Sequence, residues 1–455
     1  MNKYDVVIIG WGKAGKTLAK KLASENKKIA IIEKDPKMFG GTCINVGCLP
    51  TKALVHASKI AQQARKFGVK LNWNEKQKYY YEAIKYKKEF VKKLNDKNFN
   101  LLDKQDNIDT YVGSASFISK NEIEISSSNH KQVIFGDKIV INTGAKNRKL
   151  DHKVEVKSKN AFYSNDILNL TKLPKRLLVI GSGFIGLEFA SIYANFGSKV
   201  TVYSHNDVFM PSEDASDAAA VKQALQEQGI EFVNNVDVNS IKDYTNDVKV
   251  ISTIEDKKMQ QHFDAVLVAI GRIPNIDSLW LQNAGVQVQN HTIVVDENLK
   301  TTTENIWAVG DCKGGEFFTY ISLDDSRIVF PQLLEQVNER TRNNRPIIPW
   351  SMFIDPIYAR VGMNEKQAQQ AGIKYSVRSL LTAQIPKAHV INETTGFNKL
   401  LLNENDEIIG ATLFNYEAAE MINIISLAIV YKIKFSDLKN FIYTHPTFIE
   451  NLNEF

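Results

Sequence analysis

Short apolar runs that end in glycine recur along the chain. The first is DVVII (5–9), followed by GWGKAG, a helix-compatible stretch KTLAKKLASE and a second run, KIAIIE, which ends at Glu33. Continuous apolar runs of this length are typical of strands that are buried on both faces of a parallel sheet. The pattern therefore predicts a strand–turn–helix–strand unit at the start of the chain.

The same pattern returns in the middle of the sequence. RLLVI (176–180) is followed by GSGFIG, a helix-compatible stretch at 187–197 and an apolar strand at 198–205. Further apolar runs that end in glycine turns are KIVINTGA, DAVLVAIGR and NIWAVGD. Strands that alternate with helices in this way predict an α/β protein with two Rossmann-like dinucleotide-binding domains, each a three-layer ββα structure.

The last part of the chain, from about residue 345, has a different pattern. VGMNEKQAQQAG predicts a helix, and FNKLLLNENDEIIGATLF predicts a hairpin that turns at Asn405 and Asp406. AAEMINIISLAIVYKI is apolar on most sides, which predicts a largely buried helix. We therefore expect a separate C-terminal α+β domain.

Lysine and tyrosine are concentrated in residues 76–104. A basic aromatic surface for RNA or a membrane is one interpretation, but the helical period favours a long amphipathic helix with a solvated lysine face. The formal net charge of the whole chain is only +6, which indicates solubility and not nucleic-acid binding. No secretory signal and no apolar run long enough to span a membrane is apparent, so we expect a cytoplasmic protein.

The spacing GxGxxG gives the two predicted units their chemistry, through Gly10, Gly12, Gly15, Gly181, Gly183 and Gly186. Such glycines let the backbone approach a pyrophosphate at a helix N-terminus. Glu33 follows the first set at the distance expected of an acid that binds ribose hydroxyls. Ser204 and then His205 occupy the corresponding place in the second unit. Because the acid is missing, a 2′-phosphate would meet less repulsion, which slightly favours NADPH and leaves NADH open. Ser204 is equally well interpreted as an ordinary residue at the end of a strand.

The stretch GGTCINVGCLPTK (40–52) contains two of the three cysteines, Cys43 and Cys48. A disulfide staple would close only a short loop and stabilise the fold by about 2 kcal/mol. A zinc site would need about four ligands, and no nearby cysteine or histidine completes the set. A redox pair fits better, because a helix that begins near Cys48 and the charge of Lys52 one turn later would both favour a thiolate.

Asp311 ends another predicted strand, in VGD. A carboxylate there can bind a cofactor hydroxyl, and the alternative is a helix N-cap.

Together these motifs resemble the flavoprotein pyridine nucleotide–disulfide reductases, which include glutathione reductase, lipoamide dehydrogenase and mercuric reductase. The similarity runs along essentially the whole chain and includes GSASF (113–117), NTGA (142–145), GSGFIGLE (181–188), GRIPN (271–275), VGD (309–311) and HPTFIE (445–450). The resemblance implies a discontinuous FAD-binding domain (1–150 and 273–340), an NAD(P)-binding domain (151–272) and a C-terminal dimerisation domain (345–455).

The resemblance also implies roles for individual residues. Cys48 would face the flavin, and Cys43 would be the interchange thiol that meets the substrate. Lys52 would pair with Glu188 beside the flavin, and Phe184 would be the gate on the nicotinamide side. His445, oriented by Glu450 and supplied by the partner subunit, would be the acid–base group, which implies a homodimer. The further FAD residues implied are Lys34, Gly41, Thr42, Ser114, Ala115, Thr143, Gly144, Arg272, Asp311 and Thr319, and the further NAD(P)H residues are Val238 and Gly271.

A narrower similarity, in GWGKAGKTLA, TYISLDD and THPTFIENLNEF, is to the bacterial reactive-chlorine-resistance flavoproteins, also described as hypothiocyanous acid reductases. It implies that NAD(P)H reduces a small oxidant, hypothiocyanous acid, through FAD and the cysteine pair. The alternatives are a dihydrolipoamide dehydrogenase or glutathione-type disulfide reductase, a copper(II) or mercuric ion reductase, and a binding subunit of a larger complex. No resident metal is expected, and only His56 and His445 are candidates to bind copper near Cys43.

Overall fold

The computed structural model describes residues 1–128 and 130–455, and the chain forms two compact units. Unit 1 comprises residues 1–53, 83–148 and 271–345, and unit 2 comprises residues 54–82, 149–270 and 346–455. Helices α3 (Cys48–Lys66) and α4 (Trp73–Asp103) contribute residues to both units. The three predicted domains divide the chain more finely, and their boundaries stay a prediction.

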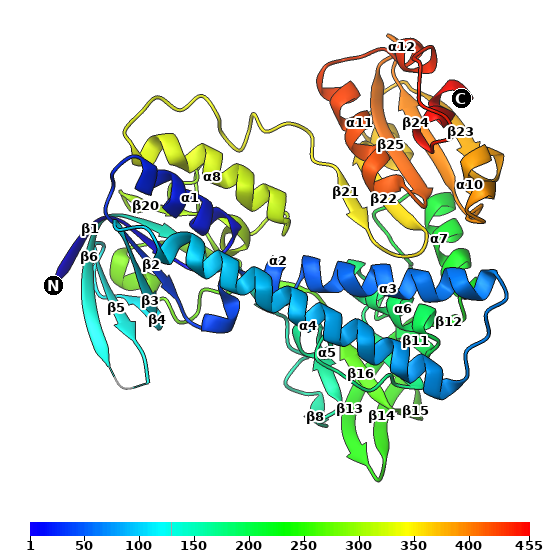
Figure 1. Ribbon diagram of the computed structural model, residues 1–455, viewed down its shortest axis with the longest axis horizontal. Helices are drawn as coiled ribbons and strands as arrows, with labels where there is room; N and C mark the ends of the chain where they lie inside the picture. The colour runs from blue at the N-terminus through cyan, green and yellow to red at the C-terminus, as the bar shows by residue number, and fades with distance from the viewer. Residues whose placement is uncertain (129) are drawn as a thin grey trace. The chain divides into compact units, whose positions relative to one another are not determined.

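Unit 1 is built on a seven-stranded sheet in the order β3-β2-β1-β6-β5-β4, with β20 paired to β6 (Figure 1). The pairs among β3, β2, β1, β6 and β20 are parallel, and β5 pairs antiparallel with both β4 and β6. The strands are β1 (Asn2–Ile9), β2 (Ile29–Glu33), β3 (Ile108–Val112), β4 (Ser114–Phe117), β5 (Glu122–Ser126), β6 (Lys131–Ile141) and β20 (Ile306–Ala308).

Helices α1 (Lys13–Ser24) and α8 (Thr319–Leu333) lie side by side in unit 1 (Figure 1). The buried residues of α1 include Ala14, Leu18 and Leu22, which repeat every four positions and so form one apolar face. That face joins a core with the alternate strand residues Val6 and Ile8. Unit 1 also contains α2 (Thr42–Asn45), β7 (Ala145–Asn147), β17 (Arg272–Pro274), β18 (Val288–Gln289), β19 (Thr292–Ile293), η1 (Pro36–Met38), η2 (Leu281–Ala284) and η3 (Gly310–Lys313).

Unit 2 contains a second parallel sheet, of order β12-β11-β10-β16-β9, and a four-stranded sheet of order β15-β14-β13-β8. Helix α6 (Phe184–Phe196) follows β10, as the second glycine pattern predicts. The other elements are β8 (Glu155–Lys157), β9 (Ala161–Tyr163), α5 (Ser164–Ile167), β10 (Arg176–Ile180), β11 (Lys199–Tyr203), α7 (Ala215–Glu227), β12 (Ile230–Val233), β13 (Val236–Tyr244), β14 (Asp247–Ile254), β15 (Lys257–Phe263) and β16 (Ala265–Val268).

The C-terminal part of unit 2 is an antiparallel sheet of order β21-β22-β25-β24-β23 with helices, which confirms the α+β prediction. The predicted hairpin is β24 and β25, and the predicted helix at 361–372 is only the short α9. The elements are β21 (Trp350–Met352), β22 (Ile357–Gly362), α9 (Glu365–Gln370), β23 (Ser376–Leu381), η4 (Thr382–Gln384), α10 (Pro386–Val390), β24 (Phe397–Leu402), β25 (Ile408–Asn415), α11 (Ala418–Val430), α12 (Phe435–Lys439) and η5 (Ile449–Asn453).

Helix α11 corrects one prediction, because it is buried on one face and not on most sides. Met421, Ile422 and Ile425 lie in the core, whereas Leu427 is 56% exposed and Val430 is 42% exposed. An apolar helix that is exposed on one side is typical of a surface that a second subunit covers.

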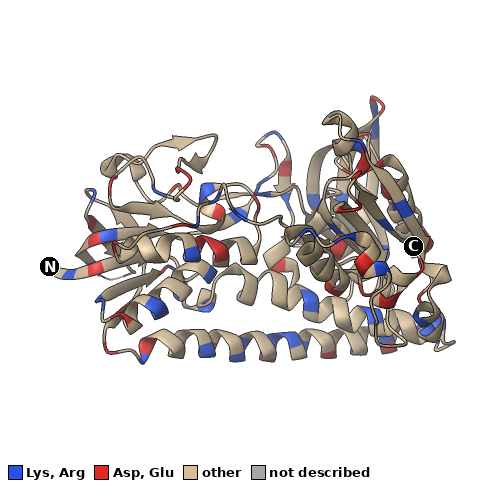
Figure 2. Cartoon of the chain, turned by 90° about the horizontal axis from the view of Figure 1, so that it is seen from above, with Lys and Arg blue, Asp and Glu red and all other residues tan. Residues whose placement is uncertain are grey.

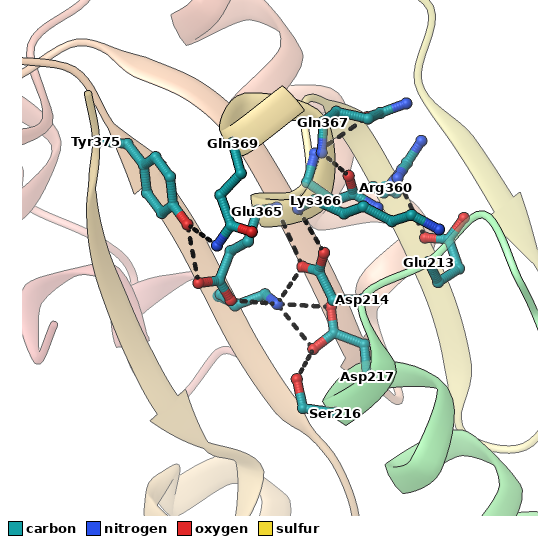
Figure 3. Close-up of polar contacts among 12 residues, drawn as sticks. Glu213, Asp214, Ser216, Asp217, Arg360, Glu365, Lys366, Gln367, Gln369 and Tyr375 are labelled. Carbon is teal, nitrogen blue, oxygen red and sulfur yellow. Dashed lines mark hydrogen bonds and ion pairs between the residues drawn. The ribbon is translucent and has the colours of Figure 1, made fainter. Parts of the chain in front are cut away.

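A buried charge cluster holds the start of α7 to the C-terminal sheet within unit 2. The ammonium of Lys399 on β24 lies 2.7 Å from Asp214, 2.8 Å from Asp217 and 3.1 Å from Glu365. These acidic side chains point toward one another in Figure 3. Asp214 also accepts hydrogen bonds from the backbone N–H groups of Glu365 and Lys366. One buried lysine therefore partly neutralises three carboxylates, two of which are buried.

Helix α4 covers the lysine-rich stretch, so the helix prediction is confirmed. Basic and acidic residues are interspersed along the ribbon in Figure 2. Within the described ranges, no helix combines the length and the apolar character needed to cross a bilayer.

Candidate active site

The first glycine turn lies between β1 and α1 in unit 1. Gly10 has φ +106°, a conformation that favours glycine, and its N–H donates to the carbonyl of Ile32 at 2.8 Å. Gly12 is the N-cap of α1, and no side chain caps that helix end. Uncapped N–H groups at a helix N-terminus suit a phosphate group, so this turn fits the pyrophosphate of a dinucleotide.

Asn142 holds the first glycine turn in place, and the sequence reasoning missed it. Its side-chain oxygen accepts a hydrogen bond from the N–H of Gly15 at 2.8 Å, and its amide donates to the carbonyl of Val309 at 3.1 Å. A Cβ added to Gly12 would stand 2.7 Å from the same oxygen, which explains why this turn needs small residues. Asn142 is part of the motif NTGA, from which only Thr143 and Gly144 were predicted as site residues.

Glu33 lies at the end of β2, as predicted. Its carboxylate accepts hydrogen bonds from the backbone N–H of Trp11 at 3.1 Å and of Asp35 at 3.2 Å. Burial nevertheless raises its pKa. The backbone therefore holds this carboxylate next to the glycine turn, and its contact with a ribose stays a prediction.

The remaining predicted FAD residues all lie in unit 1. Most of them occupy turns and the ends of elements: Lys34 after β2, Gly41 and Thr42 at the start of α2, Ser114 and Ala115 in β4, Thr143 and Gly144 after β6, Arg272 in β17, Asp311 in η3 and Thr319 at the start of α8. The buried hydroxyl of Thr143 has no hydrogen-bond partner in the part of the chain that the structure describes. An unsatisfied buried hydroxyl at this turn fits a site that a polar ligand completes.

Asp311 is not a helix N-cap, so that alternative is wrong. It lies within the short helix η3, and α8 begins later, at Thr319, with Phe318 as its N-cap. Burial raises the pKa of Asp311, although the charge of Arg272 acts in the opposite direction. The turn itself is held by the buried Asp325, whose carboxylate accepts from the N–H of Gly310 at 2.7 Å.

Cys43 and Cys48 lie next to each other as free thiols, and their side chains are hydrogen-bonded. Cys43 is half-buried in α2, and Cys48 is the first residue of α3, as the sequence predicts. The sulfur of Cys48 lies 3.5 Å from the hydroxyl of Thr319, which is the first residue of α8. Two helix N-termini therefore meet at this sulfur.

The two thiols differ in acidity. The hydrogen bond from Cys43 lowers the pKa of Cys48 to about 6; Thr319 and the charge of Lys52 act in the same direction, against the effect of burial. The same hydrogen bond raises the pKa of Cys43 well above its ordinary value. The surroundings therefore favour negative charge on Cys48 over Cys43 in the reduced pair, an arrangement that suits thiol–disulfide chemistry.

The second glycine turn lies between β10 and α6 in unit 2. Gly181 has φ +111°, and its N–H donates to the carbonyl of Tyr203 at 2.8 Å. Gly183 is the N-cap of α6 without a side-chain cap, and a Cβ at this position would meet only open space. A Cβ on Gly186 would collide with the carbonyl of Gly181. This turn also fits a dinucleotide pyrophosphate.

Ser204 is buried at the end of β11, and its hydroxyl accepts from Ser182 at 3.1 Å and from the N–H of Asn206 at 3.2 Å. His205 pairs with Asp237 at 3.0 Å, and both side chains are exposed. The carboxylate of Asp237 thus lies beside His205, next to position 204, where the sequence has serine and not an acid. No sequence motif indicated Asp237. Val238 lies in β13, and Gly271 is the first residue of a segment of unit 1, so its part in the nucleotide site stays a prediction.

Glu188 lies on the first turns of α6, and its carboxylate accepts from the backbone N–H of Phe353 at 2.8 Å. Phe184, the first residue of α6, is 39% exposed and stacks on Trp350 with ring centroids 4.7 Å apart. The predicted pairing of Lys52 with Glu188 stays a prediction.

His445 and Glu450 form a pair near the C-terminus. The Nδ1 atom of His445 lies 2.8 Å from Glu450, whose other oxygen accepts from the N–H of Thr447 at 2.9 Å. The imidazole is 71% exposed, whereas the carboxylate is 16% exposed. A fixed carboxylate that orients an exposed histidine is the arrangement of an acid–base group.

Among the described residues, no three histidine, cysteine, aspartate or glutamate side chains gather in a way that could hold a metal ion.

Comparison with known proteins agrees with this geometry. Residues 4–332 match the family model "pyridine nucleotide-disulphide oxidoreductase", and residues 348–455 match the dimerisation domain of that family. The chain belongs to the pyridine nucleotide-disulphide oxidoreductases, a family of flavoprotein enzymes that use FAD and a pyridine nucleotide. The predicted fold class is confirmed.

Within the family, the chain groups with RclA. It is 41% identical to RclA of Escherichia coli (strain K12), described as a probable pyridine nucleotide-disulfide oxidoreductase, over 100% of this chain and 99% of that protein. A solved structure, the Cu(II) complex of the HOCl-induced flavoprotein disulfide reductase RclA from Escherichia coli, matches with a TM-score of 0.92 and 39% identity, over 100% of this chain and 99% of that chain. Dihydrolipoyl dehydrogenase of Buchnera aphidicola is 32% identical, over 99% of this chain and 96% of that protein.

Proposed function

We propose that the protein is a cytoplasmic, homodimeric, NAD(P)H-dependent flavoprotein that reduces hypothiocyanous acid to thiocyanate. The observation that carries this proposal is the asymmetric cysteine pair, in which the pKa of Cys48 falls to about 6 while that of Cys43 rises. A thiolate held beside a second thiol can close a disulfide rapidly after that thiol has reacted.

The proposed reaction begins at Cys43, whose thiolate attacks the sulfur of hypothiocyanous acid. A bond forms between the two sulfurs, and hydroxide leaves and takes up a proton to become water. The Cys48 thiolate then attacks the sulfur of Cys43, forms the disulfide and expels thiocyanate. The oxidant gains two electrons and the dithiol loses two. Rapid closure by Cys48 protects Cys43 from further oxidation.

Attack by Cys43 requires a base, because its hydrogen bond with Cys48 raises the pKa of its thiol. His445, oriented by Glu450, is the proposed base and is supplied by the partner subunit. The match of residues 348–455 to a dimerisation domain supports this assembly. The exposed apolar face of α11 supports it as well.

The cysteine pair must be reduced again after each turnover. The second glycine turn would hold NAD(P)H, which would supply a hydride, and the first glycine turn would hold FAD, which would pass the two electrons to the disulfide. Gly10, Gly12 and Asn142 shape the FAD turn, and Gly181 and Gly183 shape the other. Asp311 and Arg272 are proposed to hold the remaining polar groups of FAD.

The nucleotide preference is the finer part of this proposal. Ser204 favours NADPH because it carries no charge, and the exposed His205 could meet a 2′-phosphate. The carboxylate of Asp237 beside His205 acts against NADPH. We retain NADPH as the preferred donor, with NADH as the alternative.

The decisive experiment measures NAD(P)H oxidation by the purified protein. Hypothiocyanous acid, oxidised glutathione, lipoamide and copper(II) are offered in parallel at equal concentration. We expect the highest kcat/KM with hypothiocyanous acid, and one thiocyanate formed for each nucleotide oxidised. Turnover with lipoamide or oxidised glutathione far above the rest would contradict the proposed substrate and leave the disulfide reductase chemistry intact.

Copper(II) reduction is the second candidate, because a similar solved structure is a Cu(II) complex of RclA. His56 and His445 are the ligands that the sequence suggests. Substitution of each histidine separately by alanine distinguishes the candidates, because copper(II) turnover would fall in both single variants, whereas hypothiocyanous acid turnover would fall only with His445→Ala.

A further inference from the structure

The N-terminal end of α6 contacts strand β21 and Phe353, the residue after that strand, within unit 2. At one end of the contact, the carboxylate of Glu188 accepts the backbone N–H of Phe353 at 2.8 Å. At the other end, the rings of Phe184 and Trp350 stack with centroids 4.7 Å apart and planes inclined by 27°. Phe184 and Glu188 are one helical turn apart, so both side chains lie on the same face of α6. The two contacts fix the register of strand and helix.

Trp350 is itself held on its other sides. It pairs with Arg360 across β21 and β22, and the Arg360 guanidinium lies 5.6 Å from the indole ring centre. The ring of Tyr358 lies 5.6 Å from the same indole. Glu213 then ties down both neighbours, because it accepts the Tyr358 hydroxyl at 2.9 Å and lies 3.3 Å from Arg360. The indole is therefore a rigid support rather than a mobile surface ring.

Phe184 is the first residue of α6 and directly follows the second glycine turn. It follows Gly183 directly, where a Cβ would meet open space. Although Trp350 covers part of the ring, the side chain remains 39% exposed. A phenyl ring that is backed by one aromatic group and is otherwise exposed can receive a second flat ring.

We propose that Trp350 is a positioning residue for nucleotide binding: it backs Phe184 so that the phenyl ring presents a fixed, open face to the nicotinamide of NAD(P)H. This inference rests on the proposed function, since it assumes that unit 2 binds a pyridine nucleotide. Without Trp350, Phe184 would occupy several rotamers, and binding would have to order the ring. Only the nicotinamide end of the nucleotide would lose affinity.

The test compares Trp350→Ala with the wild-type protein by isothermal titration calorimetry of the oxidised, FAD-loaded dimer. The intact probes are NADP+ and NAD+, and the probes without nicotinamide are 2′-phospho-ADP-ribose and ADP-ribose. We expect the Kd of the intact nucleotide to rise by about two- to tenfold, which is what an aromatic pair of this kind contributes. The Kd of the matching fragment should stay the same, which also shows that the variant folds.

Two further variants sharpen the result. Trp350→Phe keeps a backing ring and should restore the wild-type Kd. In a Phe184→Ala background, Trp350→Ala should add no further loss, because there is no ring left to position. Trp280→Ala, at a 58% exposed tryptophan of unit 1, is the matched control and should change neither Kd.

Equal or tighter binding of the intact nucleotide by Trp350→Ala would overturn the proposal, as would an equal loss for the fragment. If the wild-type protein binds neither NADP+ nor NAD+, the proposed function itself fails, which is a distinguishable outcome.

Discussion

Lys399 offers the sharpest test of how unit 2 is held together. Its side chain is only 6% exposed and contacts Asp214, Asp217 and Glu365 within 3.1 Å. The substitution Lys399→Met keeps an unbranched apolar stem but removes the charged ammonium group. Three carboxylates then remain close together, and two of them are buried. Breaking a buried ion pair from one side costs about 3–5 kcal/mol, because the remaining charge has no partner.

The decrease in the free energy of unfolding caused by Lys399→Met should be largest at neutral pH. Burial already raises the pKa of Asp217, and removal of the lysine would raise the carboxyl pKa values further. A carboxyl group whose pKa is higher in the folded than in the unfolded protein destabilises the fold as the pH rises through that range. The difference between variant and wild type should therefore shrink as the pH falls from 7 toward the ordinary carboxyl pKa of about 4.

Hydrogen–deuterium exchange locates the effect. The amides of Glu365 and Lys366 donate to Asp214, so they should exchange faster in the variant. Urea unfolding at pH 7 and pH 5 measures the free energy. Lys374→Met is the matched control, because Lys374 is 83% exposed and its pair with Glu404 contributes about 0–1 kcal/mol. A loss under about 1 kcal/mol for Lys399→Met, or an equal loss at both pH values, would refute this reasoning.

Three further predictions concern the chemistry. Cys43→Ser should abolish turnover but keep the flavin spectrum and one titratable thiol at Cys48; unchanged activity would contradict the role of Cys43. Thr319→Val removes a hydrogen-bond donor and should raise the Cys48 pKa from about 6 by about one unit, measured as thiolate absorbance against pH in the reduced protein. Because folding lowers the pKa of Cys48, its thiolate stabilises the folded protein fully above pH 9, and this stabilisation is lost as the pH falls toward 6. In Thr319→Val the loss should end at a higher pH, because the folded-state pKa of Cys48 is higher. Ser204→Glu should lower kcat/KM for NADPH and spare NADH; an unchanged NADPH rate would show that Ser204 does not select the nucleotide.

Local patterns were sufficient to predict much of the fold. The apolar runs predicted β1 and β10, and the glycines after them predicted the turns into α1 and α6. These predictions succeed because a buried parallel strand and a glycine with positive φ leave a signal within a few consecutive residues. The start of α3 at Cys48 was predictable for the same reason.

Other features depend on partners that are distant in the sequence. Asn142 joins the glycine turn of α1 to Val309, and Asp237 in β13 pairs with His205, which follows β11. Nothing in the neighbouring residues reports such contacts. The prediction that α11 is largely buried failed because composition indicates how apolar a helix is, but not which of its faces the rest of the chain covers.

The sequence by itself determined the order of strands and glycine turns, the family and the redox cysteine motif, because each is encoded by residues close together in the chain. Only the tertiary structure decided that Thr319 and Lys52 favour negative charge on Cys48, that Trp350 stacks on Phe184, and that the buried Lys399 contacts three carboxylates. Acidity, stacking and charge balance depend on distances between groups, and those distances are set when remote segments pack together.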